Sequence, residues 1–188
     1  MEKSMNEKCR VLLVEDNPGD ARLTRQYLAE AGPLQFEVTH ADRFSTATEY
    51  LAKMEQDVIL LDMALPDGRG PDLVAQVLTR FPAIPVIVLT GTYKDEAIAL
   101  EALKNGAEDY LIKDRIDAPG LVRAIRYAIQ RKRAEELAKK AARELQEKVV
   151  QLERLNRIMM DREERILELK EEVRKLQAPS NTNMPGKG

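Results

Sequence analysis

Three acidic residues come directly after two apolar runs of the sequence. Glu15 and Asp16 follow the run at residues 11–14, and Asp62 follows the run at residues 58–61. Runs this short and this apolar are typical of strands that are buried on both faces of a parallel sheet. Ligands bind at the carboxyl edge of such sheets, so we expect the three carboxylates to meet there. For Asp62 alone, the alternative is a solvated acid that opens a loop.

A hydroxyl and an amine follow two later apolar runs. In PVIVLTG (85–91) Thr90 comes directly after the apolar residues, and in DYLIKD (109–114) Lys113 does. Converging carboxylates repel one another unless a cation holds them, and oxygen ligands with an open solvent side suit Mg²⁺. Beside such an ion, Thr90 and Lys113 could hold phosphoryl oxygens, and Asp62 could act as the nucleophile that forms an acyl phosphate.

The elements that must position these residues alternate between strands and helices. Apolar runs predict strands at residues 10–15, 36–40, 58–62, 85–91 and 109–113, and helical spacing predicts helices at residues 18–31, 44–54, 71–81 and 95–104 and from Pro119 onward. This alternation predicts an α/β fold in which helices cover both faces of a five-stranded parallel sheet. The three continuously apolar runs should be central strands, and the mixed run at residues 36–40 should lie at an edge.

The last third of the chain has the pattern of one long helix. No proline lies between Pro119 and Pro179, which predicts a helix of about 57 residues, or about 85 Å, that projects from its domain. From Leu152 onward the pattern is a heptad repeat, typical of a coiled coil that forms a dimer. The alternative is an amphipathic helix that folds back on its own domain. The a positions of the heptad repeat are Leu152, Met159, Ile166 and Val173, and its d positions are Leu155, Arg162, Leu169 and Leu176.

Composition narrows the class of protein. The net charge of −2 over 188 residues predicts neither nucleic acid nor a membrane as a partner. The single cysteine excludes an internal disulfide framework and fits the reducing cytoplasm. No apolar run approaches the roughly 18 residues of a membrane span, and the N-terminus lacks the apolar core of a signal peptide.

Four motifs resemble those of the receiver domain of bacterial two-component response regulators: VEDNPGD (14–20), LLDMALPDGRG (60–70), LTG (89–91) and AEDYLIKD (107–114). The resemblance implies the CheY-like, flavodoxin-like fold with strand order 2-1-3-4-5. The expected organisation is a receiver domain at residues 9–130, a coiled-coil helix at 131–177 continuous with the last receiver helix, and a disordered tail at 178–188.

The resemblance also implies roles for the residues at the strand ends. Asp62 would accept a phosphoryl group from a histidine kinase or phosphotransfer protein, and the protein would be no enzyme beyond its own phosphorylation and dephosphorylation. Thr90 and Lys113 would each bind a phosphoryl oxygen. The Mg²⁺ ligands would be Glu15, Asp16, Asp62 and the backbone carbonyl of Ala64.

Tyr110 and Asp114 are two further positions at which the family has a typical residue. Tyr110 matches the switch aromatic, which turns inward as Thr90 moves; the alternative is a half-buried strand residue. The family commonly has proline after the lysine of the fifth strand, whereas Asp114 follows Lys113 here. A non-proline cis bond is costly, so we expect a trans peptide in this loop.

The first helix should begin with a cap and carry polar residues outward. Asn17 can cap it and Pro18 can begin it. In the family this helix is a docking face for the kinase, and the alternative is a plain solvated face. The residues expected to point outward near the site are Asp20, Arg22, Arg25 and Gln26.

The sequence is compatible with several functions. One is a response regulator without enzymatic or DNA-binding output, whose coil dimerises or binds a signalling partner. Another is a receiver fragment of a larger sensor kinase or other signalling enzyme. The basic residues between Arg123 and Arg133 raise DNA binding as a weaker alternative. A histidine kinase is poorly supported, because the only histidine, His40, ends an apparent strand.

Overall fold

The computed structural model describes residues 8–31, 35–91 and 96–177. Five strands form a parallel sheet in the order β2-β1-β3-β6-β7, which confirms the predicted order 2-1-3-4-5. The three continuously apolar strands are central, and β2 lies at an edge, as the sequence predicted. The strands are β1 (Cys9–Val14), β2 (Phe36–Ala41), β3 (Val58–Asp62), β6 (Val86–Thr90) and β7 (Asp109–Ile112).

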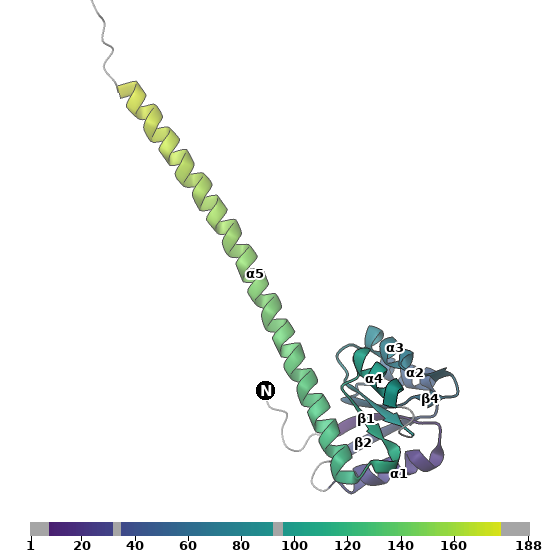
Figure 1. Ribbon diagram of the computed structural model, residues 1–188. Coiled ribbons are helices and arrows are strands. Elements are labelled where there is room, and N and C mark those ends of the chain that lie inside the picture. The colour runs from purple at the N-terminus through teal and green to yellow at the C-terminus, as the bar shows by residue number, and fades with distance from the viewer. Residues whose placement is uncertain (1–7, 32–34, 92–95, 178–188) are drawn as a thin grey trace, which may run out of the picture. The chain divides into compact units, whose positions relative to one another are not determined.

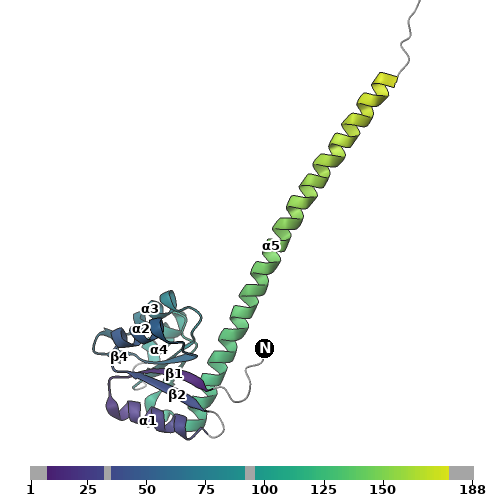
Figure 2. The same cartoon turned by 180° about the vertical axis from the view of Figure 1, so that it is seen from behind.

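Helices cover both faces of this sheet (Figures 1 and 2). Side chains alternate between the faces of a strand, so a continuously apolar strand supplies two cores. Val11, Leu13 and Leu60 pack with α1 and the first part of α5, whereas Leu12 and Ile59 pack with α2, α3 and α4. The helices are α1 (Pro18–Ala29), α2 (Phe44–Lys53), α3 (Asp72–Arg80), α4 (Glu96–Lys104) and α5 (Ala118–Gln177).

A small hairpin follows Asp62 directly. Strands β4 (Ala64–Leu65) and β5 (Gly68–Arg69) pair antiparallel, and the turn between them carries Asp67. The Asp67 carboxylate accepts hydrogen bonds from the backbone N–H groups of Phe44 (2.8 Å) and Ser45 (2.9 Å). The residue before α2, Arg43, makes no side-chain capping bond, so Asp67 caps α2 from a distant part of the sequence.

The end of α4 shows why the chain turns at Asn105-Gly106, where the sequence predicted a stop. Gly106 has a φ of 101°, in the left-handed region that favours glycine. Its N–H donates to the carbonyl of Leu103, and the N–H of Ala107 donates to the carbonyl of Ala102, both at 3.0 Å. These two bonds form a Schellman motif, which ends the helix and turns the chain into β7.

Helix α5 runs without interruption for 60 residues, which confirms the predicted long helix. The chain divides into two compact units, Met1–Leu137 and Ala138–Gly188, and the described part of the second unit is helical. The expected tail at 178–188 lies outside the described residues, and the domain boundary at residue 130 stays a prediction. None of the helices in the described ranges has the length and apolar character that a membrane span needs.

Candidate functional site

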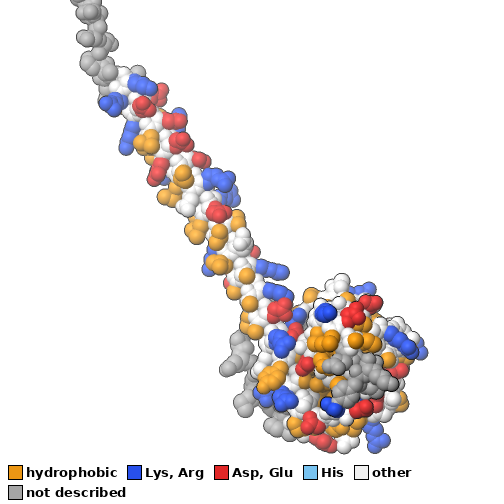
Figure 3. Space-filling model, viewed as in Figure 1, with side chains coloured by type: hydrophobic (Ala, Val, Ile, Leu, Met, Phe, Trp, Pro, Cys, Tyr) orange, Lys and Arg blue, Asp and Glu red, His pale blue; other side chains and the backbone are white. Residues whose placement is uncertain are grey.

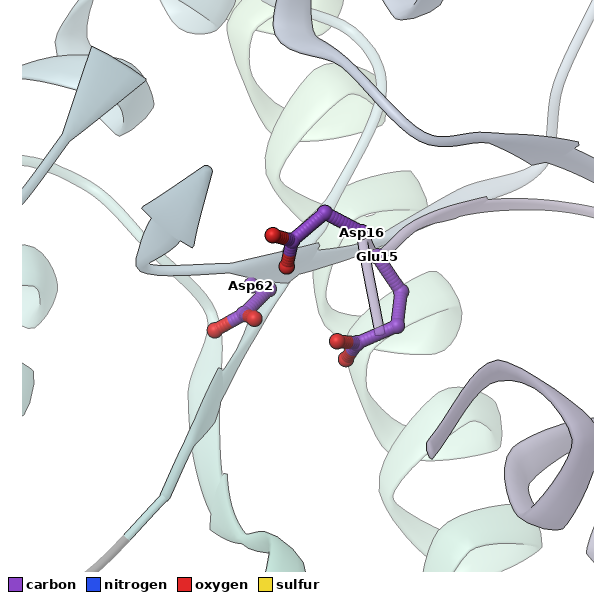
Figure 4. A group of neighbouring side chains, drawn as sticks. All are labelled: Glu15, Asp16 and Asp62. Carbon is purple, nitrogen blue, oxygen red and sulfur yellow. The ribbon is translucent and has the colours of Figure 1, made fainter. Parts of the chain in front are cut away.

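The three predicted acids lie together at the carboxyl edge of the sheet, as expected. Strands β1 and β3 are neighbours, with Val14 opposite Leu61, so Glu15 and Asp62 extend from adjacent strand ends. One carboxylate oxygen from each of Glu15, Asp16 and Asp62 lies within 4.8 Å of the others. Figure 4 shows the three carboxylates gathered around one space.

Glu15 is the most deeply buried member of this acidic cluster, with no exposed surface. Burial raises the pKa of its carboxyl to about 7, and the charge of Asp62 adds to the rise against the opposing effect of Lys113. The backbone N–H of Asn17 donates to Glu15 Oε1 at 3.2 Å. His40, predicted to end a strand, is half-buried, and its Nε2 lies 2.8 Å from the Glu15 backbone oxygen.

Lys113 supplies the positive charge that faces this cluster. It begins η2 (Lys113–Arg115), a single 3₁₀ turn after β7. Its Nζ lies 2.6 Å from Glu15 Oε2, 2.9 Å from Asp62 Oδ2 and 3.0 Å from Asp20 Oδ2. Burial by itself lowers the pKa of Lys113, but the contacts with Glu15 and Asp62 outweigh it and raise that pKa above its usual value.

The donor set fits a hard divalent cation. Three carboxylates within 4.8 Å of one another face one ammonium, so the cluster carries excess negative charge. Asp16 is exposed and leaves a side open to water, which suits Mg²⁺ because that ion keeps several waters. The backbone N–H of Ala64 donates to Asp62 Oδ1 at 3.3 Å, and the role of the Ala64 carbonyl stays a prediction.

The remaining predicted residues lie on the two strands beyond β3. Thr90, at the end of β6, is almost fully buried and lies opposite Ile112 of β7 in the register. Tyr110 is half-buried and packs against the core under α2, α3 and α4. Among the described residues every peptide bond is trans, as expected after Lys113. The inward turn of Tyr110 stays a prediction.

Asp20, expected to point outward near the site, is 39% exposed, and its carboxylate also reaches Lys113 at 3.0 Å, a contact that was not predicted. The cap predicted at Asn17 is present: its side chain accepts from the N–H groups of Gly19 (2.8 Å) and Asp20 (3.4 Å). Helix α1 therefore begins directly after the acidic pair, and its first turn brings Asp20 to Lys113. An acid four residues after Asp16, in the first turn of the next helix, is the sequence signal that could have revealed this. Arg22, Arg25 and Gln26 are exposed, as predicted.

The chain resembles known proteins over the part that carries the site. It is 36% identical over 101 residues to the regulatory protein LuxO of Vibrio cholerae, covering 54% of this chain and 21% of that one. It is 30% identical over 132 residues to the transcriptional regulatory protein DegU of Brevibacillus brevis, covering 69% of this chain and 54% of that one. The chain thus spans between about a fifth and about half of the length of these relatives.

Solved structures give the same result for the fold. The signal receiver domain of an HD domain-containing protein from Pseudomonas fluorescens superposes with a TM-score of 0.62 at 27% identity, covering 71% of this chain and 96% of that domain. A response regulator receiver domain protein from Clostridium thermocellum gives a TM-score of 0.59 at 29% identity, covering 67% and 98%.

The sequence profile of the response regulator receiver domain matches residues 11–126, which is more than half of the chain. Those residues contain the whole sheet apart from the first two positions of β1, and all three members of the acidic cluster. The chain therefore belongs to the family of response regulator receiver domains of two-component systems.

Proposed function

We propose that Asp62 accepts a phosphoryl group from a histidine kinase or a phosphotransfer protein. Receiver domains act as phosphoacceptor modules, and a receiver domain implies a cognate histidine kinase. The observation that carries the proposal is the position of the Asp62 carboxylate, in the acidic cluster and 2.9 Å from Lys113 Nζ. The kinase itself, and the cytoplasm as the compartment, are parts of the same proposal.

In the proposed step, a carboxylate oxygen of Asp62 forms a bond to the phosphorus of the donor phosphohistidine. The phosphorus–nitrogen bond breaks, and its electron pair returns to the imidazole nitrogen, so the products are an acyl phosphate and a free histidine. Lys113 pairs with one phosphoryl oxygen and the Thr90 hydroxyl donates to another. Tyr110 then turns inward beside the displaced Thr90.

Glu15, Asp16, Asp62 and the Ala64 carbonyl would hold Mg²⁺ in this site. When bound, the ion neutralises the charge that gathers between the carboxylates and the phosphoryl group. The three carboxylates offer oxygen ligands only, within 4.8 Å of one another, which supports this choice of metal.

The long helix is proposed to carry the output, by forming a dimer or by binding a signalling partner. Apolar residues at the a and d positions are exposed along the described helix, among them Leu152 at 60% and Met159 at 60%. Figure 3 shows such hydrophobic side chains recurring along it between charged ones. Because α5 follows β7 and η2 in the chain and continues into this segment, a change at the face around Tyr110 could alter how the helix pairs.

A receiver fragment of a larger sensor kinase or other signalling enzyme is the second candidate. It is favoured by the observation that the chain spans only 21% of LuxO. DNA binding through the basic residues of α5 has less support, because two of them are engaged with the receiver. Arg131 and Lys132 lie 3.8 Å and 3.9 Å from the carboxylate of Glu108.

The test of the phosphoacceptor is the variant Asp62→Asn. Wild-type protein incubated with Mg²⁺ and phosphoramidate should gain one phosphoryl group by intact mass, and Asp62→Asn should gain none. Asp67→Asn, which removes an acid outside the cluster from the same loop, should be labelled like the wild type. Full labelling of Asp62→Asn would remove Asp62 from the mechanism.

A further inference from the structure

The ammonium group of Lys113 has three carboxylate partners from three different segments. Glu15 follows β1, Asp62 ends β3 and Asp20 lies in the first turn of α1, and one oxygen of each is within 3.0 Å of Nζ. An ammonium has three N–H groups to donate. Asp20 and Asp62 each accept a hydrogen bond from it, whereas Glu15 contacts it as an ion pair in which Oε2 accepts no hydrogen bond from the described residues.

Three carboxylates surround Nζ, so an incoming phosphoryl oxygen competes with them for Lys113. The side chain of Glu15 has no exposed surface and that of Asp62 is 8% exposed, whereas that of Asp20 is 39% exposed. The first two are buried and belong to the ligand set of the proposed Mg²⁺ site, so they stay fixed there. The carboxylate of Asp20 can be hydrated as it leaves, so it is the partner released at least cost.

The position of Asp20 also affects the charge near the phosphoryl group. The three acids of the cluster and Asp20 all lie at the end of the sheet where a dianionic phosphodonor must approach. A fourth carboxylate there repels the donor. Removal of its charge should therefore favour phosphorylation both by reducing this repulsion and by freeing one N–H of Lys113.

We propose that Asp20 is a positioning residue, which holds Lys113 in the unphosphorylated protein and slows the phosphorylation of Asp62. The inference rests on the proposed phosphoacceptor function. It adds a residue outside the predicted site, and it links the first turn of α1 to the end of β7 through a contact that phosphorylation breaks.

The first test compares Asp20→Asn with Asp72→Asn. The asparagine keeps the size and one oxygen acceptor of Asp20 but removes its charge. Asp72, also in the first turn of a helix, is exposed and matches the charge change. With Mg²⁺ and phosphoramidate, the rate of labelling of Asp20→Asn should rise by about twofold to fivefold, and Asp72→Asn should match the wild type. Asp20→Glu, which keeps the charge, should be labelled at a rate close to that of the wild type. An Asp20→Asn rate equal to or below the wild-type rate would overturn the proposal.

The second test separates an effect through Lys113 from a general change of structure. In the background of Lys113→Met, which removes the ammonium, Asp20→Asn should raise the rate by much less than in the wild type. An equal rise in both backgrounds would show that Asp20 does not act through Lys113.

A third measurement does not depend on phosphorylation. The ¹⁵N resonance of the Lys113 ammonium, assigned by its loss in Lys113→Arg, should shift in Asp20→Asn and stay in place in Asp72→Asn. If the wild type is never labelled, the phosphoacceptor function fails while this resonance still tests the contact. If the resonance is the same in Asp20→Asn and in the wild type, the hold of Asp20 on Lys113 is absent.

Discussion

Asp16 differs from the other two acids of the cluster, because it is exposed and the described residues donate no hydrogen bond to its side chain. Asp16→Asn should therefore remove like-charge repulsion without breaking a contact. We expect a slightly higher melting temperature without Mg²⁺, and an affinity for Mg²⁺ that falls about tenfold or more. Thermal unfolding over a Mg²⁺ titration measures both.

The matched control is Asp42→Asn, which removes an exposed acid just after β2, outside the cluster. It should leave the dependence of the melting temperature on Mg²⁺ unchanged. If Asp16→Asn also left it unchanged, Asp16 would not be a ligand.

Residues at strand ends could be placed from the sequence, whereas the contact of Asp20 with Lys113 could not. The register of adjacent parallel strands fixes where Glu15 and Asp62 emerge, so their convergence follows once the strands are recognised. The direction of Asp20 depends on how the cap at Asn17 rotates the first turn of α1 over the strand ends. That rotation is set by hydrogen bonds over a few residues and leaves no periodic pattern to read.

At the scale of elements, the sequence predicted the five sheet strands and the five α-helices but no separate strands in the hairpin of β4 and β5. Long elements repeat a pattern over several residues, and this repetition identifies them. Strands of two residues repeat nothing, so only the Pro-Asp-Gly turn within the hairpin could be recognised. The cap that Asp67 provides to α2 joins residues 22 and 23 positions apart, and a local pattern cannot reveal it.

This cap predicts a pH-dependent contribution to stability. Burial by itself raises the pKa of Asp67, but the hydrogen bonds from Ser45 and Phe44 outweigh it and lower that pKa below its usual value. A carboxyl with a lower pKa in the folded state stabilises the fold at neutral pH. The contribution is fully present above the pKa of the unfolded chain, and it is lost as the pH falls through the pKa of the folded state.

Asp67→Ala should lower the free energy of unfolding by about 1 kcal/mol at pH 7, the usual cost of losing a helix cap. The difference from the wild type should shrink as the pH falls below about 4. Urea unfolding at several pH values provides the measurement. Asp42→Ala, which removes an exposed acid just before α2, serves as the control, and an equal loss in that variant would argue against the cap.

At the scale of the whole molecule, different sequence patterns identify the receiver and the long helix. The receiver could be predicted because its strands and helices alternate and its acids occur at strand ends. Helix α5 could be predicted because its pattern continues unbroken to Gln177. What its exposed a and d residues contact could not be predicted, because a heptad repeat describes a seam and leaves the partner and its orientation open.

Arg162 tests whether that seam joins two copies of this chain. In a parallel dimer in register, each d residue meets its own copy, so Arg162 would face the same arginine across the seam. Arg162→Leu should then remove a repulsive layer and strengthen the dimer by about tenfold or more in dissociation constant, which is roughly 1.4 kcal/mol. Arg157→Leu changes the same side chain at an outward f position and should have no such effect.

Light scattering over a dilution series, with and without Mg²⁺ and beryllofluoride, measures the dissociation constants of the wild type and both variants. A dimer that Arg162→Leu strengthens in both states would make the helix a permanent assembly device, so that signalling lies in the geometry of the pair. A dimer that forms only with beryllofluoride would make assembly itself the output. A monomer in every case would reject pairing between two copies. The apolar a and d residues would then need a helix from another protein to cover them.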